Sequence, residues 1–151
     1  MEEIFKELPY SKGYYVSNYG NVKKITNVDG EKNVKQIKTY LIGPQNNKML
    51  VFSAAYYGTK GYYVKLQLAY VVASLFLNDD VDYRYVRVGF RDGDCKNCRA
   101  DNLFLYEIDY PLTIQFIRGC ITAETIAKTK NTIKKQYKRK KDQNGNNTNT
   151  N

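Results

Sequence analysis

Residues 88–103 read VGFRDGDCKNCRADNL and carry the clearest indication of the fold. Tyr83–Phe90 alternates apolar and polar side chains, and Leu103–Ile108 is apolar and aromatic, so both segments are predicted to be strands. Asp92–Asn97 lies between them, contains an Asp-Gly turn dipeptide and is predicted to be a loop. The stretch has the frame of an active site, yet the whole chain contains no histidine.

Short strands and one apolar helix are predicted upstream. Tyr14–Val22 (YYVSNYGNV) places aromatic and β-branched residues around a Ser-Asn-x-Gly turn, which indicates a hairpin. Met49–Tyr56 and Gly61–Leu66 are predicted strands linked by a glycine-containing turn. Leu66–Leu77 is the most apolar stretch, and its length and its Ala, Leu and Ser content favour a buried helix.

The remaining segments are polar or basic. Residues 28–49 are polar, with Asp29-Gly30 as a turn. After Pro111 the chain is predicted to turn helical, and a basic helix is expected from Ala123 to about Tyr137. The last nine residues, QNGNNTNTN, are of low complexity.

Composition narrows the class of protein. No apolar run approaches the roughly 20 residues of a membrane helix, so no membrane partner is expected. The acidic start MEEIFKELPY does not fit a signal peptide, and three cysteines argue against a disulfide framework, so an intracellular location is expected. The net charge is +9, and most of it belongs to the tail, where eight basic residues and one acid follow residue 127. Such an arm favours a polyanionic partner over a merely solvated tail.

Three segments, taken in order, resemble one known family. Gly13–Lys23 (GYYVSNYGNVK) is similar to a GYxVSNxGxVR signature, and Leu68–Phe76 (LAYVVASLF) to VHRLVAxAF. Residues 89–103 resemble the segment NHxDGNxxNNxxENL, without a gap from Asp92 to Leu103. Together they resemble the HNH homing endonucleases of phages and bacteria, with the small module that precedes the nuclease.

The resemblance implies a two-stranded ribbon and a helix that grip one divalent metal, with a histidine as general base. Carried over by position, the general base falls at Phe90, the neighbouring metal ligand at Gly89, the histidine of the helix segment at Ala69 and a helix-borne asparagine at Pro111. None of these side chains binds a metal or moves a proton. The chain is therefore predicted to be no enzyme and to need no metal or other cofactor.

The retained frame consists of Asp92, Asn97 and Asn102. Asp92-Gly93 is a turn dipeptide, Asn97 tolerates a left-handed backbone, and Asn102 is expected to hydrogen-bond to the backbone. These roles maintain the fold and would persist after catalysis is lost. Phe90 is expected to fill the former metal site with apolar volume and to exclude water.

The predicted fold class is α+β and similar to HNH homing endonucleases: small antiparallel strands and hairpins packed with a ββα-metal-like core and a C-terminal helix. Its predicted parts are residues 1–66 as a β-rich module, 67–118 as the degenerate core, 119–141 as a basic helix and 142–151 as a polar tail.

The predicted function is binding without catalysis, with double-stranded DNA or another polyanion as the partner of the basic arm. Contacts from flexible lysines to phosphates carry little sequence information. The predicted nucleic-acid-binding residues are Lys128, Lys130, Lys134, Lys135, Lys138, Arg139, Lys140 and Lys141.

A structural role is the alternative: an auxiliary, capsid-associated protein of a phage particle, whose partners would be capsid proteins or further copies of itself. Its 15 tyrosines would serve as interface anchors. The expected location is the bacterial host cytoplasm for a DNA-binding protein and the virion for a structural one. A residual nuclease that uses Asp92, Asp94 and Asn102 is a third hypothesis.

Cys95-x-x-Cys98 raises the question of a zinc site. A structural zinc site takes four Cys or His ligands, whereas the chain offers only Cys95, Cys98 and Cys120. Cysteines without a role are favoured over a zinc ion shared between two copies.

Overall fold

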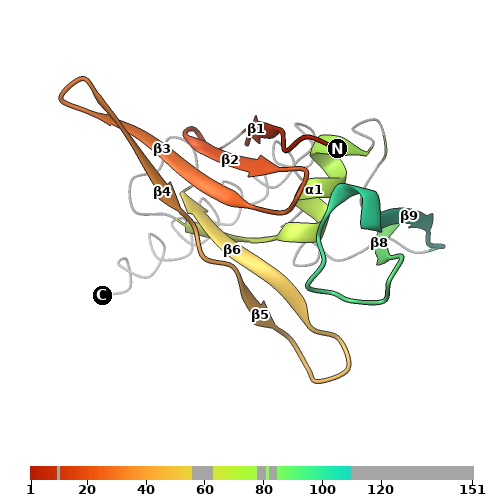
Figure 1. The fold of residues 1–151 in the computed structure, drawn as a ribbon. Helices are drawn as coiled ribbons and strands as arrows, with labels where there is room; N and C mark the ends of the chain where they lie inside the picture. Colours follow the sequence, from red (N-terminus) through yellow and green to blue (C-terminus); the bar gives the residue numbers. More distant parts are fainter. Residues whose placement is uncertain (10, 56–62, 78–80, 82–84, 110–151) are drawn as a thin grey trace, which may run out of the picture.

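The computed structural model describes residues 1–9, 11–55, 63–77, 81 and 85–109 (Figure 1). In this part of the chain, three small antiparallel sheets surround one helix, which confirms the predicted α+β class. In chain order the elements are β1 (Phe5–Glu7), β2 (Tyr14–Ser17), β3 (Val22–Val28), β4 (Glu31–Gln36), β5 (Tyr40–Ile42), β6 (Met49–Ala55), β7 (Tyr63–Gln67), α1 (Leu68–Phe76), β8 (Val86–Phe90), a 3-10 turn (Ala100–Asn102) and β9 (Leu103–Glu107).

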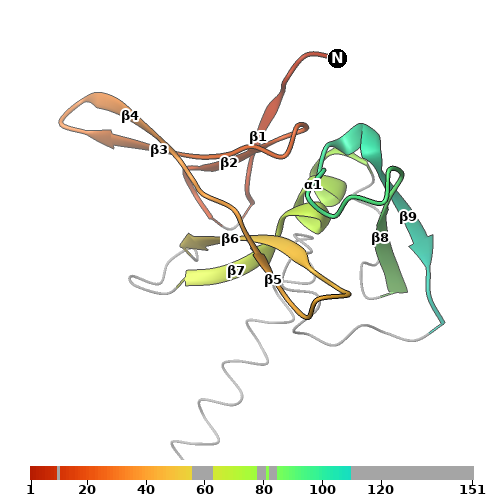
Figure 2. The same ribbon diagram turned by 60° about the horizontal axis from the view of Figure 1, so that its bottom comes forward.

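The first sheet has the strand order β1-β2-β3-β4. The predicted hairpin between Tyr14 and Val22 is confirmed, since β2 and β3 pair across the turn that follows Ser17. The next turn has Asp29 at φ 51° and Gly30 at φ 81°, which matches the twist of a tight hairpin. The paired strands β3 and β4 project from the body as a two-stranded ribbon in both views (Figures 1 and 2).

Two strands lie in the polar region between residues 28 and 49, to which the sequence assigned only a turn. All six residues of β4 are exposed, so its sequence, EKNVKQ, has no alternation of apolar and polar side chains. β5 is three residues long and pairs with one end of β6. Backbone pairing with an existing strand, rather than burial of side chains, holds both in place.

The second sheet has the order β5-β6-β7, and β7 runs directly into α1. The helix begins two residues later than the predicted start at Leu66, because Leu66 and Gln67 pair with Phe52 and Val51 of β6. Figure 2 shows the strand continuing into the helix.

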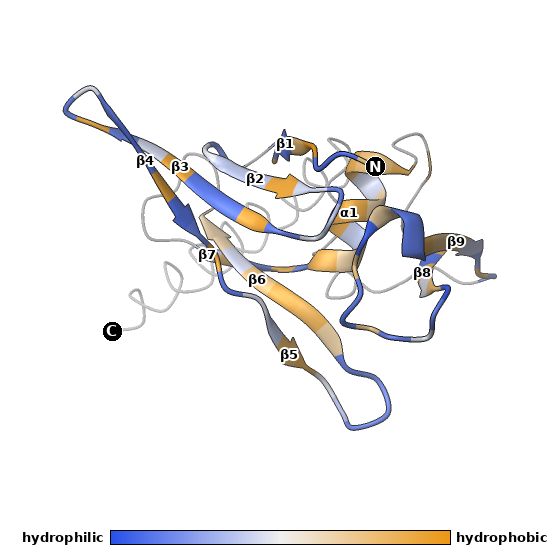
Figure 3. Cartoon of the chain, in the orientation of Figure 1, coloured by the Kyte–Doolittle hydropathy of each residue, from blue (hydrophilic) through white to orange (hydrophobic). Residues whose placement is uncertain are grey.

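The hydrophobic core forms around α1, whose residues 68–74 are all buried. The helix is apolar on every side because β2, β6 and β9 all pack against it. Figure 3 shows apolar segments of β2 and β6 beside the helix and a polar β4. One cluster joins Val16 and Phe52 with Leu103, so the core is continuous across residue 66, the predicted end of the N-terminal module.

None of the described residues forms a helix long and apolar enough to cross a membrane. The predicted helices after Pro111, the basic arm and the polar tail lie outside the described residues.

Candidate functional site

The β8–β9 hairpin carries the positions at which an HNH site would be built. In its register Phe90 pairs with Leu103, and Gly89 pairs with Phe104. Successive side chains of a strand point to opposite faces. Phe90 and Leu103 therefore lie on the face that packs against the core, whereas Gly89 and Phe104 lie on the outer face.

The packing around Gly89 adds an observation that the sequence does not show. The ring of Phe104 lies on the glycine so closely that a Cβ at residue 89 would be 2.7 and 2.8 Å from its Cε1 and Cε2 atoms. A carboxylate or amide side chain at this position requires the ring to move. Residue 89, where the resemblance places a metal ligand, thus has no donor side chain and is covered by the Phe104 ring. Sequence reasoning missed Phe104, although a glycine opposite an aromatic residue is a known cross-strand arrangement.

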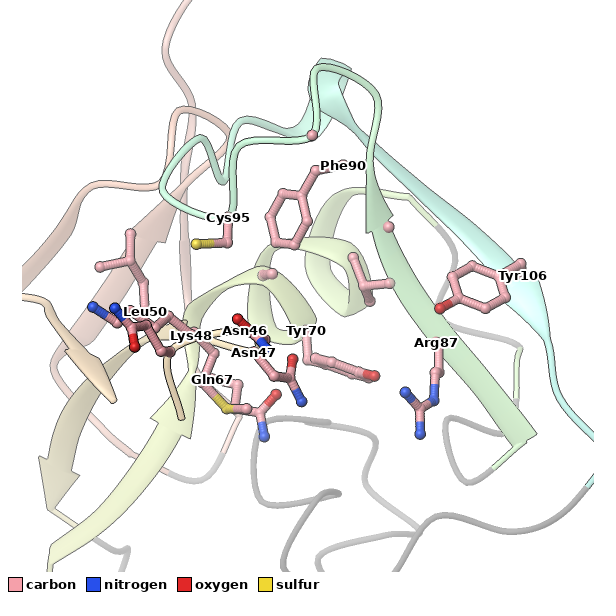
Figure 4. Close-up of a pocket in the computed structure, with 16 residues that line it drawn as sticks. Asn46, Asn47, Lys48, Leu50, Gln67, Tyr70, Arg87, Phe90, Cys95 and Tyr106 are labelled. Carbon is pink, nitrogen blue, oxygen red and sulfur yellow. The ribbon is translucent and has the colours of Figure 1, made fainter. Parts of the chain in front are cut away.

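Ala69 of α1 and Phe90 of β8 border the same hollow. This hollow is open and has a volume of about 460 Å³, and Gly89 and Cys95 also line it. Figure 4 shows Phe90 and Cys95 among the side chains that line it. Phe90 is half-buried and packs partly against the core. The hollow remains open beside the ring, and the expectation that Phe90 fills the former metal site stays a prediction.

The rim of the hollow is polar and basic. Figure 4 shows amide, phenol and cationic side chains around it, from the turn between β5 and β6 and from α1 and β8. Among the described lining residues there is no carboxylate and no histidine. The polar members of the lining are Gln45, Asn46, Asn47, Lys48, Gln67, Tyr70, Arg87, Cys95 and Tyr106.

Asp92, Asn97 and Asn102 form one hydrogen-bonded cluster in the loop between β8 and β9. Asn102 is 8% exposed; its Nδ2 donates to Oδ1 of Asp92 at 2.9 Å and to the carbonyl of Asn97 at 2.8 Å. Its Oδ1 accepts from the amide of Asp92 at 3.1 Å. Asn97 Nδ2 donates to the other carboxylate oxygen of Asp92 at 2.8 Å. The hydrogen bonds of all three side chains therefore stabilise the conformation of the loop.

The same hydrogen bonds favour the charged form of the Asp92 carboxyl. Hydrogen bonds from Asn97, from the amide of Asp94 and from Asn102 hold the pKa of the Asp92 carboxyl below its usual value. The group is ionised at neutral pH, with both oxygens engaged by donors of the loop. This matches the fold-keeping role that the sequence suggested.

The loop is also attached to the turn between β2 and β3. The amide of Ala100 donates to the carbonyl of Asn18 at 2.8 Å. The guanidinium carbon of Arg99 lies 4.1 Å from the centre of the Tyr19 ring. A Cβ on Gly20, which has φ +83°, would be 3.3 Å from the carbonyl oxygen of Cys98. The Ser-Asn-x-Gly segment is thus the joint between the first sheet and the β8–β9 loop.

The two described cysteines differ in their surroundings. Cys98 is 3% exposed, and burial raises the pKa of its thiol to about 12. Cys95 is half-buried at the rim of the hollow. No cluster of three or more potential metal ligands occurs among residues the structure describes. Cys120, Pro111 and the predicted basic residues from Lys128 to Lys141 lie outside them.

Comparisons with known proteins agree with this architecture. Residues 3–50 match the model of a family described as the NUMOD4 motif. The fold is similar to a solved structure that describes DNA binding and cleavage by the HNH homing endonuclease I-HmuI, with a TM-score of 0.50 and 19% sequence identity. The match covers 71% of this chain and 53% of that one, so this chain spans about half the length of the endonuclease. No curated protein matches the sequence. The predicted HNH-endonuclease-like fold is confirmed.

Proposed function

We propose that the protein binds nucleic acid without cleaving it, and that the β3–β4 ribbon provides a contact with duplex DNA. The observation that carries the proposal is the ribbon itself: a projecting pair of strands that is exposed from residue 26 to residue 36, with four lysines and two acidic residues between residues 22 and 36. The major groove of DNA admits a two-stranded ribbon of this kind. The solved HNH endonuclease of the same fold binds DNA, which supports binding here.

The ribbon presents polar groups on both of its faces. Lys24 pairs with Lys35, and Thr26 pairs with Asn33, so these four side chains share one face. Asn27 and Lys32 pair on the other face. Lysines supply phosphate contacts, whereas Asn and Thr side chains are able to hydrogen-bond to base edges.

Two lysines at the base of the ribbon rest on aromatic rings. Lys23 Nζ is 3.6 Å from the centre of the Phe5 ring, and Lys24 Nζ is 5.0 Å from that of Tyr14. These contacts restrict the long side chains before any ligand binds, which lowers the entropy lost on binding.

Duplex binding over a range of salt concentrations tests the proposal, with fluorescence anisotropy of a labelled duplex as the measurement. The double variant Lys32→Gln/Lys35→Gln is expected to reduce the slope of log K against log salt by about 2, roughly 0.9 per lost phosphate contact. Lys65→Gln, at an exposed lysine of β7, is the matched control and should leave the slope unchanged. Replacing the basic residues from Lys128 to Lys141 with glutamine measures how much of the slope is due to the predicted basic arm.

Absence of a salt-sensitive complex in the unchanged protein would overturn the proposal. A slope lowered only by the changes between Lys128 and Lys141 would exclude the ribbon and leave the arm as the interface.

Lack of catalysis belongs to the same proposal, and it is supported by Phe104 covering Gly89 and by Ala69 and Phe90 at histidine positions. Supercoiled plasmid incubated with the protein and Mg²⁺ or Mn²⁺ is expected to stay intact. Metal-dependent nicking that persists through further purification would show that the chain is a nuclease after all. A role in a phage particle and the location of the protein remain predictions, since no observation favours them.

A further inference from the structure

We propose that the outer face of the β8–β9 hairpin binds unpaired nucleobases, so that the protein holds single-stranded DNA or RNA at this face. The inference rests on the proposed nucleic-acid binding and adds a second contact, separate from the ribbon. Four residues define the face: Arg87 and Gly89 on β8, and Phe104 and Tyr106 on β9. The register pairs Arg87 with Tyr106 and Gly89 with Phe104, so all four lie on one side of the hairpin.

Two aromatic rings are exposed side by side on this face. Phe104 is 37% exposed and Tyr106 is 44% exposed. Their centres are 5.9 Å apart, and their planes meet at 37°. Aromatic rings on neighbouring positions of a sheet are the surface on which successive unpaired bases stack.

Gly89 sets the position of the Phe104 ring. With no side chain on the opposite residue, the ring lies against the backbone of β8, and any Cβ at residue 89 would overlap it. The ring is therefore fixed before a ligand arrives, and little conformational entropy is lost when a base stacks on it.

Charge favours a nucleic acid over a protein as the occupant. The guanidinium carbon of Arg91, an exposed residue, lies 5.8 Å from the centre of the Phe104 ring. None of the residues that define the face is acidic; Glu107 pairs with Val86 on the other face. Arginine beside an aromatic ring offers phosphate contacts and cation–π contacts at once.

The face also continues into the hollow, whose lining includes Arg87, Gly89, Tyr106 and the cation Lys48 (Figure 4). The lining of the hollow, as far as the structure describes it, includes Lys48 and no carboxylate, so a base stacked on Tyr106 would have a cation near its phosphate. Bases inside a duplex present only their edges, because their flat faces are stacked on one another. The face therefore selects unpaired bases.

A tryptophan reporter tests the inference, since the natural chain contains no tryptophan. Tyr106→Trp places one indole on the face, and Tyr63→Trp, at a 59% exposed tyrosine of β7, is the matched control. Titration with oligothymidylate is expected to quench the fluorescence of the first variant in a saturable way and to leave the second unchanged. A blunt-ended duplex without unpaired bases is expected to quench neither.

Affinity provides the second measurement. Tyr106→Ala should weaken binding of a labelled single strand about fivefold or more, the usual loss for one stacked base, and should leave duplex binding unchanged. Phe104→Leu keeps an apolar side chain over Gly89 while removing the ring, so it should show the same selective loss with an unchanged circular dichroism spectrum.

The outcomes separate this inference from the proposed function. Duplex binding without quenching by single strands overturns the inference and leaves the proposed function intact. Failure to bind either form of nucleic acid overturns both. If the fluorescence falls as the protein concentration rises, without any nucleic acid, the face is a protein interface and the inference is overturned as well.

Discussion

Replacing Asn102 should cost more stability than replacing Asn97, the other asparagine of the cluster in the β8–β9 loop. Asn102→Ala removes two donated hydrogen bonds and one accepted hydrogen bond from a side chain that is 8% exposed. At about 0.5–1.5 kcal/mol for each lost hydrogen bond, the free energy of unfolding should fall by about 1.5–4.5 kcal/mol. Asn97→Ala loses one exposed hydrogen bond to Asp92 and should cost about 0.5–1.5 kcal/mol.

Urea unfolding followed by tyrosine fluorescence measures both values, because the chain has 15 tyrosines and no tryptophan. With a slope of about 2 kcal/mol per molar urea, the Asn102→Ala midpoint should move down by about 1–2 M. A shift no larger than that of Asn97→Ala would refute the assignment of Asn102 as the centre of the cluster.

Acid titration of Asn102→Asp tests the same geometry. At neutral pH this variant places a carboxylate against Oδ1 of Asp92, in place of a donor now at 2.9 Å. Like charges raise the pKa of one carboxyl, so the penalty is present above that raised pKa and disappears as the pH falls through it. In the natural protein the pKa of Asp92 is lowered, so its contribution is full above the unfolded value, 3.8, and is lost as the pH falls below it. The stability difference between the two proteins should therefore shrink between neutral pH and about pH 4. A constant difference across this range would show that the two side chains are not in contact.

Two further predictions concern single positions. Gly13→Ala should destabilise the protein by about 2–3 kcal/mol, since φ is +86° and the new Cβ would be 2.7 Å from the carbonyl oxygen of Ile25. Gly30→Ala, at φ +81° with no atom within 4 Å, should cost only about 1 kcal/mol; equal costs in thermal unfolding would contradict the role of the close approach. In the native protein at mildly alkaline pH, iodoacetamide should label Cys95 before Cys98, because burial raises the pKa of Cys98 to about 12. Tryptic peptides separate the two cysteines, and equal labelling rates would show that the loop opens.

The sequence predicted the helix and the central hairpins because their patterns are local. The apolar run before Leu77 and the turn after Ser17 each carry their own signal, and both are confirmed. The start of α1 was misplaced because residues 66 and 67 are held by pairing with β6, a contact distant in sequence. β4 was missed because pairing with β3, rather than side-chain burial, forms it.

The positions that form the candidate site were predictable from the sequence, but the shape of its surface was not. Spacing from Asp92 to Leu103 placed Phe90 and Gly89 on one strand, and the hydrogen-bonded role of Asn102 followed from its residue type. The ring of Phe104 over Gly89 depends on the register between β8 and β9, which no single segment specifies. For the same reason the open hollow beside Phe90 was not predictable from the sequence.

The hydrogen bond from the Ala100 amide to the Asn18 carbonyl makes two distant segments open together. The Ala100 proton exchanges with solvent only when the turn after Ser17 separates from the loop. Its rate of hydrogen exchange therefore reports the free energy of opening this joint, not that of the β8–β9 loop alone. Substitutions in the first sheet that loosen the turn should accelerate exchange at residue 100, far along the chain. The HNH-like half of the fold thus takes part of its rigidity from the module that precedes it.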